Sequence, residues 1–138
     1  MQFIDTQTVA KTLPYDQLIE ALRVAFKNQI HSPERTQYRI ETDATSDATL
    51  LLMPAWKKSQ HIGIKVVSVF PENTKNSLSA VNASYLLLDG KNGIPKAILD
   101  GTELTLRRTA CASALAADYL ARDDASSLLM VGTGNLAP

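Results

Sequence analysis

Lys65 is the residue of this sequence that is best placed to do chemistry. It lies in the middle of an apolar run, between Ile64 and Val66. A lysine in such a run either faces solvent on one side of a sheet or is held in a partly dry site. In a dry site its ammonium binds a carboxylate or, with a lowered pKa, moves a proton. Composition alone favours the solvent-facing interpretation, and both stay open at this point.

Two arginines form a second set of candidates. Arg108 follows Arg107 near the start of a predicted long helix, and Arg35 lies in a loop before the first strand of a predicted sheet. A planar guanidinium binds a carboxylate through two parallel hydrogen bonds. Arginines are also common on solvated surfaces, so residue type alone does not decide their role. The histidines and the single cysteine have no metal-ligand spacing, and we expect no metal site.

A glycine motif closes the sequence. Residues 132–137 read Gly-Thr-Gly-Asn-Leu-Ala and directly follow the apolar run Leu-Leu-Met-Val at 128–131. A strand that ends in Gly-x-Gly-x-x-Ala is typical of the start of a dinucleotide-binding βαβ unit, where backbone amides approach a pyrophosphate. The helix, the next strand and the acidic residue of such a unit do not follow. Taken alone, the motif is an even choice between nucleotide binding and coincidence.

Hydrophobic periodicity predicts the elements that position these residues. The sequence predicts helices that end near residue 13 and span residues 15–30, then a long helix over 102–122. Apolar runs and turn residues predict strands at residues 3–4, 37–43, 49–53, 61–70, 80–88, 94–99 and 126–131. The fold class that we expect is α+β: N-terminal helices, a mostly antiparallel six-stranded sheet and a long helix, followed by one further strand. This order indicates two domains, residues 1–122 and the beginning of another at 123–138.

Composition narrows the partners. The 138 residues have a formal net charge of zero, which leaves no electrostatic footprint for nucleic acid or an anionic membrane. No stretch has the length of a membrane span, and the N-terminus lacks the pattern of a secretory signal. The single cysteine cannot form an internal disulfide, which fits a reducing compartment. We therefore expect a cytoplasmic protein without nucleic-acid or membrane partners.

Taken in order, the motifs resemble those of the ornithine cyclodeaminase/mu-crystallin family, and the matches span nearly the whole chain. They comprise a Met-Pro-Ala turn, a Gly-x-Lys-x-Val block with Pro-x-Asn after it, a hairpin, a long-helix signature and a nucleotide loop, at Met53–Ala55, Gly63–Val67, Pro71–Asn73, residues 86–100, 104–122 and 132–134. The resemblance implies a substrate-binding and dimerisation domain at 1–122 and the first strand of a truncated Rossmann domain at 123–138.

The resemblance also implies site residues and partners. Arg35, Lys65 and Arg108 would bind the carboxylate of a small amino or imino acid, with Lys65 as the catalytic proton donor or acceptor. Cofactor contacts would come from Thr109 and from the loop, at Gly132, Gly134, Asn135 and Leu136. The implied cofactor is NAD(H) or NADP(H). Two copies of the sheet would join in a homodimer, which removes exposed sheet edges.

The expected activity is that of an NAD(P)-dependent imino-acid reductase, acting on a cyclic ketimine such as Δ1-pyrroline-2-carboxylate to give L-proline. Leu51 supports this preference, because some ornithine cyclodeaminases have an acidic residue there, near the substrate amino groups. The alternatives are an ornithine cyclodeaminase, an alanine dehydrogenase-like enzyme and a non-catalytic carrier of small ligands. We expect the 138-residue chain alone to be inactive, because half of the cleft would be missing.

Overall fold

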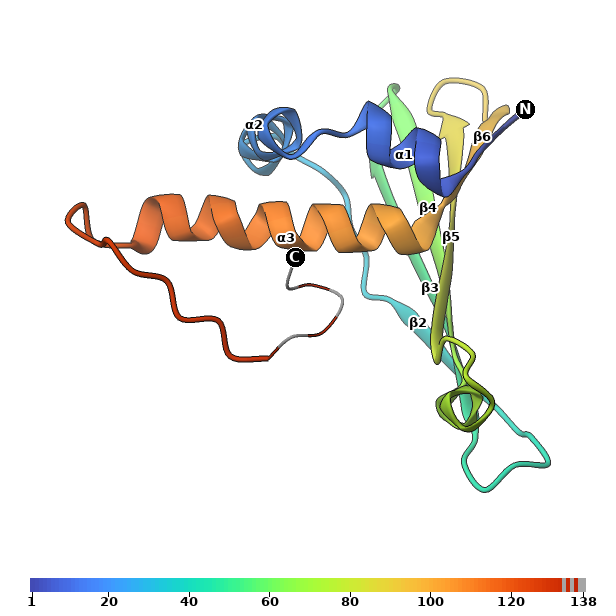
Figure 1. Ribbon diagram of the computed structural model, residues 1–138. Coiled ribbons are helices and arrows are strands. Elements are labelled where there is room, and N and C mark those ends of the chain that lie inside the picture. Colours follow the sequence, from blue (N-terminus) through green and yellow to red (C-terminus); the bar gives the residue numbers. More distant parts are fainter. Residues whose placement is uncertain (133, 135, 137–138) are drawn as a thin grey trace.

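The computed structural model describes residues 1–132, 134 and 136, and it consists of a six-stranded sheet with three α-helices on one of its faces (Figure 1). The elements in chain order are β1 (Gln2–Ile4), α1 (Thr6–Thr12), α2 (Tyr15–Phe26), β2 (Thr36–Ile40), β3 (Ala48–Lys57), β4 (His61–Val69), η1 (Pro71–Asn76), β5 (Val81–Asp89), β6 (Pro95–Asp100) and α3 (Gly101–Leu120). The α+β class and the six strands of the sheet are as predicted.

The sheet has the order β1-β6-β5-β4-β3-β2. Strands β2 to β6 follow one another as antiparallel neighbours, and β1 pairs in parallel with β6 at the edge. The β5–β6 turn forms as its sequence predicts, because Asp89 and Asn92 accept backbone N–H bonds from residues two positions ahead and Gly93 has a φ of 74°. Short turns therefore join β3 to β4 and β5 to β6, and a longer connection through η1 joins β4 to β5.

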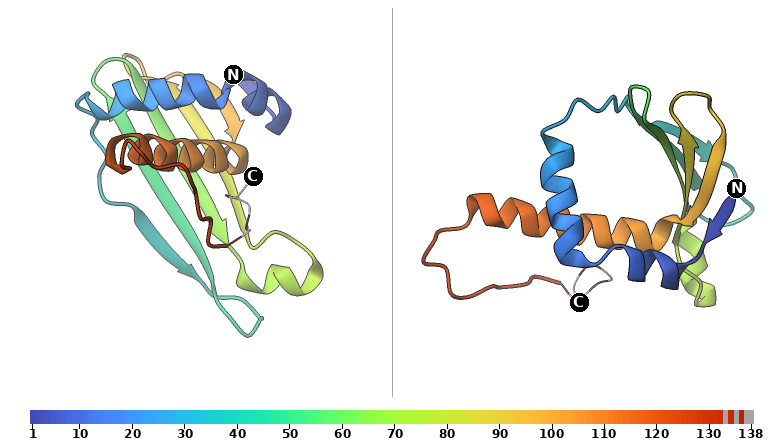
Figure 2. Two further views of the ribbon diagram at one scale, coloured as in Figure 1. Left: turned by 60° about the vertical axis from the view of Figure 1, so that its left-hand side comes forward. Right: turned by 90° about the horizontal axis from the view of Figure 1, so that it is seen from above.

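Helix α3 stands out from the sheet, and only its first turns contact the strands (Figures 1 and 2). Its start is fixed by Asp100, whose Oδ1 accepts from the N–H of Glu103 at 2.7 Å while its Oδ2 accepts from the hydroxyl of Thr6, also at 2.7 Å. Helices α1 and α2 lie alongside α3, and the best-buried side chains between these helices are Val9, Cys111 and Leu115. The core thus fixes α3 at a set angle to the sheet.

Several predicted elements differ from the structure; among the differences, β2 ends at Ile40, three residues earlier than predicted. Strand β3 continues through Pro54, because β2 pairs only as far as Leu52 and leaves free the side on which proline lacks an N–H. Helix α2 ends at Phe26, four residues earlier than predicted. Residues 126–131 form no strand, since no strand of the described part of the chain lies beside them to supply hydrogen bonds.

No helix in the described ranges covers the other face of the sheet (Figure 2). Strand register assigns that face an apolar row, since residues directly opposite one another share a face. One row across three strands consists of Leu52, Val66 and Ser84. The next row is apolar throughout and consists of Pro54, Ile64, Leu86 and Ile98. Phe3 shares this face through its pairing with Ile98 and is 79% exposed. We call this surface the open sheet face.

Candidate functional site: paired cations beside α3 and a glycine-lined cavity

Lys65 occupies the middle of β4 on the face that carries α3. It pairs with Met53 on one side and Tyr85 on the other, both on central strands. The side chain is half-buried, and its Nζ donates a hydrogen bond of 3.5 Å to the hydroxyl of Thr105 on α3. Lys65 therefore lies on the helical side of the sheet and is only partly exposed to solvent. The lysine lies where the foot of α3 meets the sheet.

Arg108 reaches the same place from α3. Its charge acts on Lys65 directly: burial, and after it the positive charge of Arg108, lower the pKa of the Lys65 ammonium. Arg108 itself is exposed. In the part of the chain that the structure describes, neither cation has an ion pair with a carboxylate. Two neighbouring cations repel each other, and an anion that binds both relieves that repulsion. The pair therefore has the electrostatics of an anion-binding site.

Arg35 lies next to the cations along the sheet. The isolated bridge between His31 and Trp56 and the first β2 pair, Thr36 with Leu52, bracket the loop that carries it. The loop therefore runs alongside residues 53–55 of β3, the strand that pairs with the Lys65 strand β4. Arg35 is exposed there. The structure brings Lys65 and Arg108 together and puts Arg35 at the adjacent edge of the same region.

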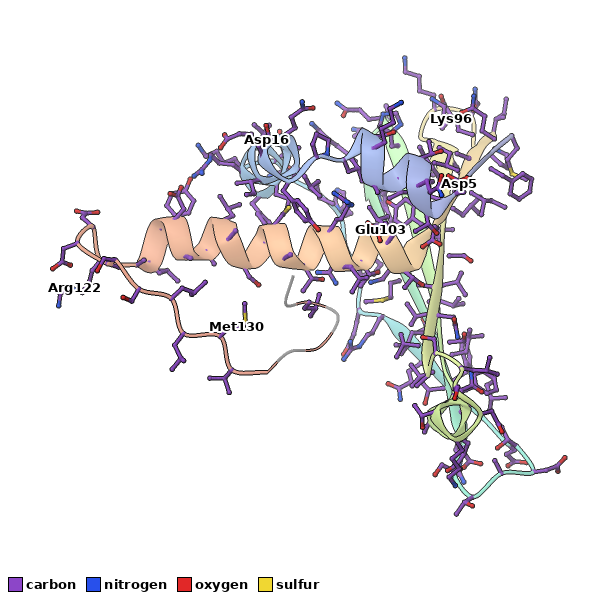
Figure 3. All side chains as sticks on the ribbon, viewed as in Figure 1. Asp5, Asp16, Lys96, Glu103, Arg122 and Met130 are labelled. Atoms are coloured by element: carbon purple, nitrogen blue, oxygen red, sulfur yellow. The ribbon has the colours of Figure 1, made fainter. Side chains whose placement is uncertain are left out.

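Arg107, although next to Arg108 in sequence, has a structural role. Its Nε donates to Glu103 at 2.6 Å, its Nη1 donates to the carbonyl of Leu13 at 3.1 Å, and its guanidinium lies 4.6 Å from the ring centroid of Tyr15. These contacts join α3 to the α1–α2 connection, near the sheet end of α3 where Glu103 lies (Figure 3). Arg107 thus holds helices together, whereas the Arg108 side chain makes no hydrogen bond or ion pair with the other residues that the structure describes.

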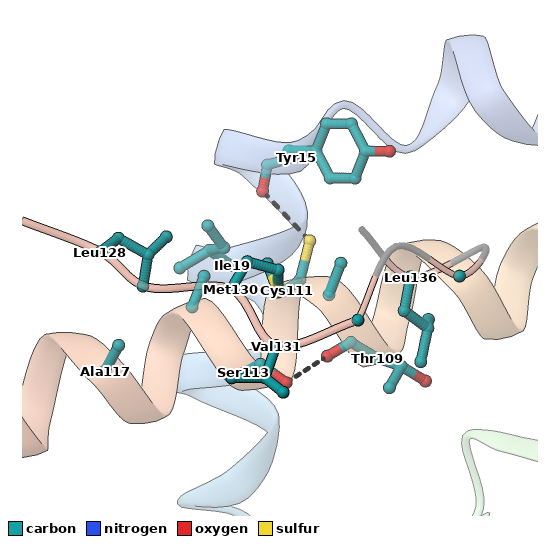
Figure 4. Close-up of a pocket in the computed structure, with 14 residues that line it drawn as sticks. Tyr15, Ile19, Thr109, Cys111, Ser113, Ala117, Leu128, Met130, Val131 and Leu136 are labelled. Carbon is teal, nitrogen blue, oxygen red and sulfur yellow. Dashed lines mark hydrogen bonds between the residues drawn. The ribbon is translucent and has the colours of Figure 1, made fainter. Parts of the chain in front are cut away.

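Four of the five residues predicted to contact a cofactor line one cavity of about 600 Å³ (Figure 4). Thr109 borders it from α3, and Gly132, Gly134 and Leu136 border it from the segment that lies beneath this helix. Asn135 lies outside the described residues. The other walls are mostly small or apolar side chains of α2, α3 and residues 128–131, namely Ile19, Ala110, Ala114, Ala117, Leu128, Met130 and Val131. The lining does not include the paired cations.

Two glycines of the terminal motif, Gly132 and Gly134, lie among the described residues. Gly132 has a φ of 102°, a backbone conformation that residues other than glycine rarely adopt. A Cβ added at Gly132 or Gly134 would meet no atom within 4 Å, so the backbone there is open to close approach. Thr109 stays in place because its hydroxyl donates to the carbonyl of Thr105 at 2.6 Å. Gly132 and Gly134 therefore leave room for another group to approach the backbone beside an apolar wall.

Comparison with known proteins identifies the family of the chain. Residues 2–138 match the ornithine cyclodeaminase/mu-crystallin family. The chain belongs to that family. A Δ1-pyrroline-2-carboxylate reductase of Colwellia psychrerythraea is 36% identical over 140 residues, which are 99% of this chain and 44% of that protein. The chain therefore spans less than half the length of this relative.

Two solved structures have the same fold. The Thermococcus litoralis Δ1-pyrroline-2-carboxylate reductase, in complex with NADH and L-proline, superposes with a TM-score of 0.77 at 36% identity over 90% of this chain. An archaeal alanine dehydrogenase dimer with bound NAD gives a TM-score of 0.76 at 28% identity over 91% of the chain. This chain covers 39% of each of those structures. The fold and the family predicted from the motifs are confirmed.

Two residues of the site were not singled out from the sequence. Tyr85 lies directly across from Lys65 on β5, and Thr105 accepts the lysine hydrogen bond. Helical spacing could have predicted Thr105, because it precedes Arg108 by three residues and therefore lies on the same side of α3. The sequence could not have predicted Tyr85, because the register of β4 against β5 depends on the long connection through η1.

Among the described helices, none is long and apolar enough to cross a membrane.

Proposed function

We propose that the full-length protein is an NAD(P)H-dependent imino-acid reductase that converts Δ1-pyrroline-2-carboxylate to L-proline. The observation that carries the proposal is the Lys65–Arg108 pair, two neighbouring cations of which one has a lowered pKa. Two similar proteins have the name Δ1-pyrroline-2-carboxylate reductase, and one of them binds NADH and L-proline. The site roles below are part of the proposal.

The substrate carboxylate binds to Arg108 and Lys65, with Arg35 closing over it from the loop before β2. A carboxylate offers about four lone-pair sites, enough for a guanidinium fork and an ammonium together. Binding also removes the repulsion between the two cations. Fixing the carboxylate orients the ring, so the C=N carbon presents one face to the hydride donor, which is the proximity contribution to catalysis.

Lys65 supplies the proton that the reaction needs. An imine accepts hydride readily only when its nitrogen is protonated, and a lysine with a lowered pKa gives up its proton more easily at neutral pH. The lowered pKa of Lys65 has burial as its first cause and Arg108 as its second. Lys65 therefore binds the carboxylate region as a cation and passes its proton, directly or through one water molecule, to the ring nitrogen.

The nucleotide cofactor, when bound, supplies the hydride. Gly132, Gly134, Asn135 and Leu136 would hold it with Thr109, and the open backbone at both glycines supports this assignment. The apolar wall of the same cavity suits a nicotinamide or adenine ring. The boundary between the substrate domain and the cofactor domain lies near residue 122, where α3 has ended. Either NADH or NADPH is compatible with these residues.

A homodimer formed through the open sheet face completes the proposal. On this face an apolar row crosses five strands, with Pro54, Ile64, Leu86, Ile98 and Phe3 side by side, and soluble proteins rarely leave a large apolar surface in water. The similar alanine dehydrogenase is a dimer. Changing Ile64 to Glu in the centre of the face will yield monomers in light scattering, whereas Lys58→Glu in the exposed β3–β4 turn will not. A dimer that survives Ile64→Glu would refute the assignment of this face.

The proposal is tested by kinetic assays of the full-length protein. Oxidation of NADH and of NADPH is followed with Δ1-pyrroline-2-carboxylate, and ammonia release is followed with L-ornithine and NAD⁺. The expected result is reduction of the cyclic imine with at least one of the two cofactors and little ammonia from ornithine. Rapid ammonia release from ornithine without imine reduction would overturn the proposal in favour of a cyclodeaminase.

A further inference from the structure

The sheet around Lys65 forms a floor that can be described position by position. Nine residues of β3, β4 and β5 make up this floor, because paired residues and every second residue along a strand lie on one face. They are Leu51, Met53 and Ala55 on β3, Gly63, Lys65 and Val67 on β4, and Ala83, Tyr85 and Leu87 on β5. Of these nine, only Lys65 and Tyr85 carry polar groups, and none is acidic.

The composition of the floor restricts the ligand. A second ammonium group on a substrate would lie over apolar side chains without a carboxylate to pair with, and burying such a charge is costly. A carbon ring, in contrast, gains from contact with Leu51, Met53 and Val67. The floor therefore suits a compact cyclic carboxylate, and Tyr85 is the one neutral polar residue on it.

The phenol of Tyr85 lies across Gly63. A Cβ built at Gly63 would be 1.8 Å from the Tyr85 hydroxyl oxygen and 2.5 Å from Cζ, distances that no real side chain tolerates. Gly63 thus provides the space into which the ring fits. Its partner on β3 is Ala55, whose side chain is also small. Without the phenol, the floor would have a hollow above Gly63 and Ala55.

We propose that Tyr85 is a specificity-determining residue, whose ring fills this hollow and restricts the site to a five-membered cyclic imine carboxylate. The inference rests on the proposed function, because it takes Lys65 as the residue beside the reacting nitrogen. Tyr85 lies directly across from Lys65, at a Cβ separation of about 5 Å for paired strands. A ring bound at Lys65 therefore touches the phenol on its β5 side.

The phenol acts through its shape. Burial raises the pKa of Tyr85 above its ordinary value, so the hydroxyl stays protonated and uncharged at neutral pH. An uncharged ring neither attracts the carboxylate nor competes with Arg108 for it. One ring methylene more or less in a fitted pocket is worth about 10- to 200-fold in kcat/KM, which is the selectivity that the filled hollow supplies.

The test compares two substrates, Δ1-pyrroline-2-carboxylate and its six-membered homologue Δ1-piperideine-2-carboxylate, on the full-length protein. Tyr85→Ala is expected to lower the five-to-six kcat/KM ratio by about tenfold or more. Tyr85→Phe keeps the ring and is expected to leave the ratio within about threefold. An unchanged ratio in a folded Tyr85→Ala protein that still reduces the five-membered substrate would overturn the role of Tyr85 and leave the proposed function standing.

A double-mutant cycle tests the contact itself. Gly63→Ala will impair a protein that has Tyr85, because the new methyl group expels the phenol, and will have little effect in a Tyr85→Ala background. Equal effects in both backgrounds would contradict the contact.

If the wild-type protein reduces neither imine, the proposed function fails, and calorimetry with pyrrole-2-carboxylate and pyridine-2-carboxylate decides the role of Tyr85. A preference for the smaller ring that Tyr85→Ala abolishes supports the role; equal binding or none overturns it.

Discussion

Lys65 and Thr105, 40 residues apart in sequence, share a hydrogen bond of 3.5 Å between Nζ and the threonine hydroxyl. That hydroxyl donates in turn to the carbonyl of Gly101 at 2.6 Å, so its oxygen is oriented to accept from the lysine. A side chain in the first turns of α3 therefore holds the ammonium of a central strand in place. The catalytic candidate is positioned by the contact between helix and sheet.

The Thr105 hydroxyl is expected to set the pKa of Lys65 as well as its position. Thr105→Val removes an acceptor that favours the charged ammonium, so the pKa of Lys65 falls further. The pH profile of kcat/KM for imine reduction will then shift to lower pH by about half a unit to one unit. Thr105→Ser, which retains the hydroxyl, is the matched control. A Thr105→Val profile that coincides with the wild-type profile would show that the contact does not tune the lysine.

Lys65 is also expected to cost the fold some stability. Its pKa is lower in the folded state than in the unfolded chain, where it returns to its ordinary value of 10.5. Below the folded-state pKa, the full penalty of holding the charge beside Arg108 is present. As pH rises between the two pKa values, the unfolded chain binds more protons than the folded one, so wild-type stability increases with pH.

Lys65→Met removes this penalty. The variant will be more stable than wild type at pH 7, by at most about 1 kcal/mol because the half-exposed side chain is partly screened by solvent. The difference will disappear as pH rises through the lowered pKa towards 10.5. Urea unfolding at a series of pH values measures it. A variant that is less stable than wild type at pH 7 would argue against a strained cation pair.

Asp100 is expected to be a main support of the site, because it caps the helix that carries Thr105 and Arg108. Asp100→Ala loses the cap to Glu103 N–H and the bond from the Thr6 hydroxyl. Loss of such a cap costs about 0.5–2 kcal/mol. Asp100→Asn keeps the capping oxygen and should cost less. Urea unfolding distinguishes them, and an unchanged midpoint for Asp100→Ala would contradict this role.

Local signals were sufficient for the meander and for the motifs that carry the family resemblance. Turn residues between Asp89 and Gly93 define the β5–β6 hairpin, and the apolar run around Lys65 defines β4. Local signals could not predict the partners of Lys65, because its pairing with Tyr85 depends on the register of β4 and β5 across η1. The apolar run at 128–131 has the composition of a strand, yet a strand also needs a neighbour with which to share hydrogen bonds.

The roles of Arg35 and of the glycine loop depend on contacts with ligands, which neither periodicity nor spacing supplies. Arg35 lies in a loop, where residue type carries little information. Arg107 and Arg108 are adjacent in sequence, and only the packing of α3 against the α1–α2 connection shows that Arg107 is the structural one. For these residues the three-dimensional arrangement was necessary.

The measurement that tests the central claim most directly is the kcat/KM of the full-length protein for Δ1-pyrroline-2-carboxylate after Lys65→Met, with Lys58→Met in the exposed β3–β4 turn as control. Loss of a positioned proton donor costs about 10²- to 10⁴-fold. We predict a loss in that range or greater for Lys65→Met and wild-type activity for Lys58→Met. A Lys65→Met protein with activity within a few-fold of wild type would contradict the assignment of Lys65.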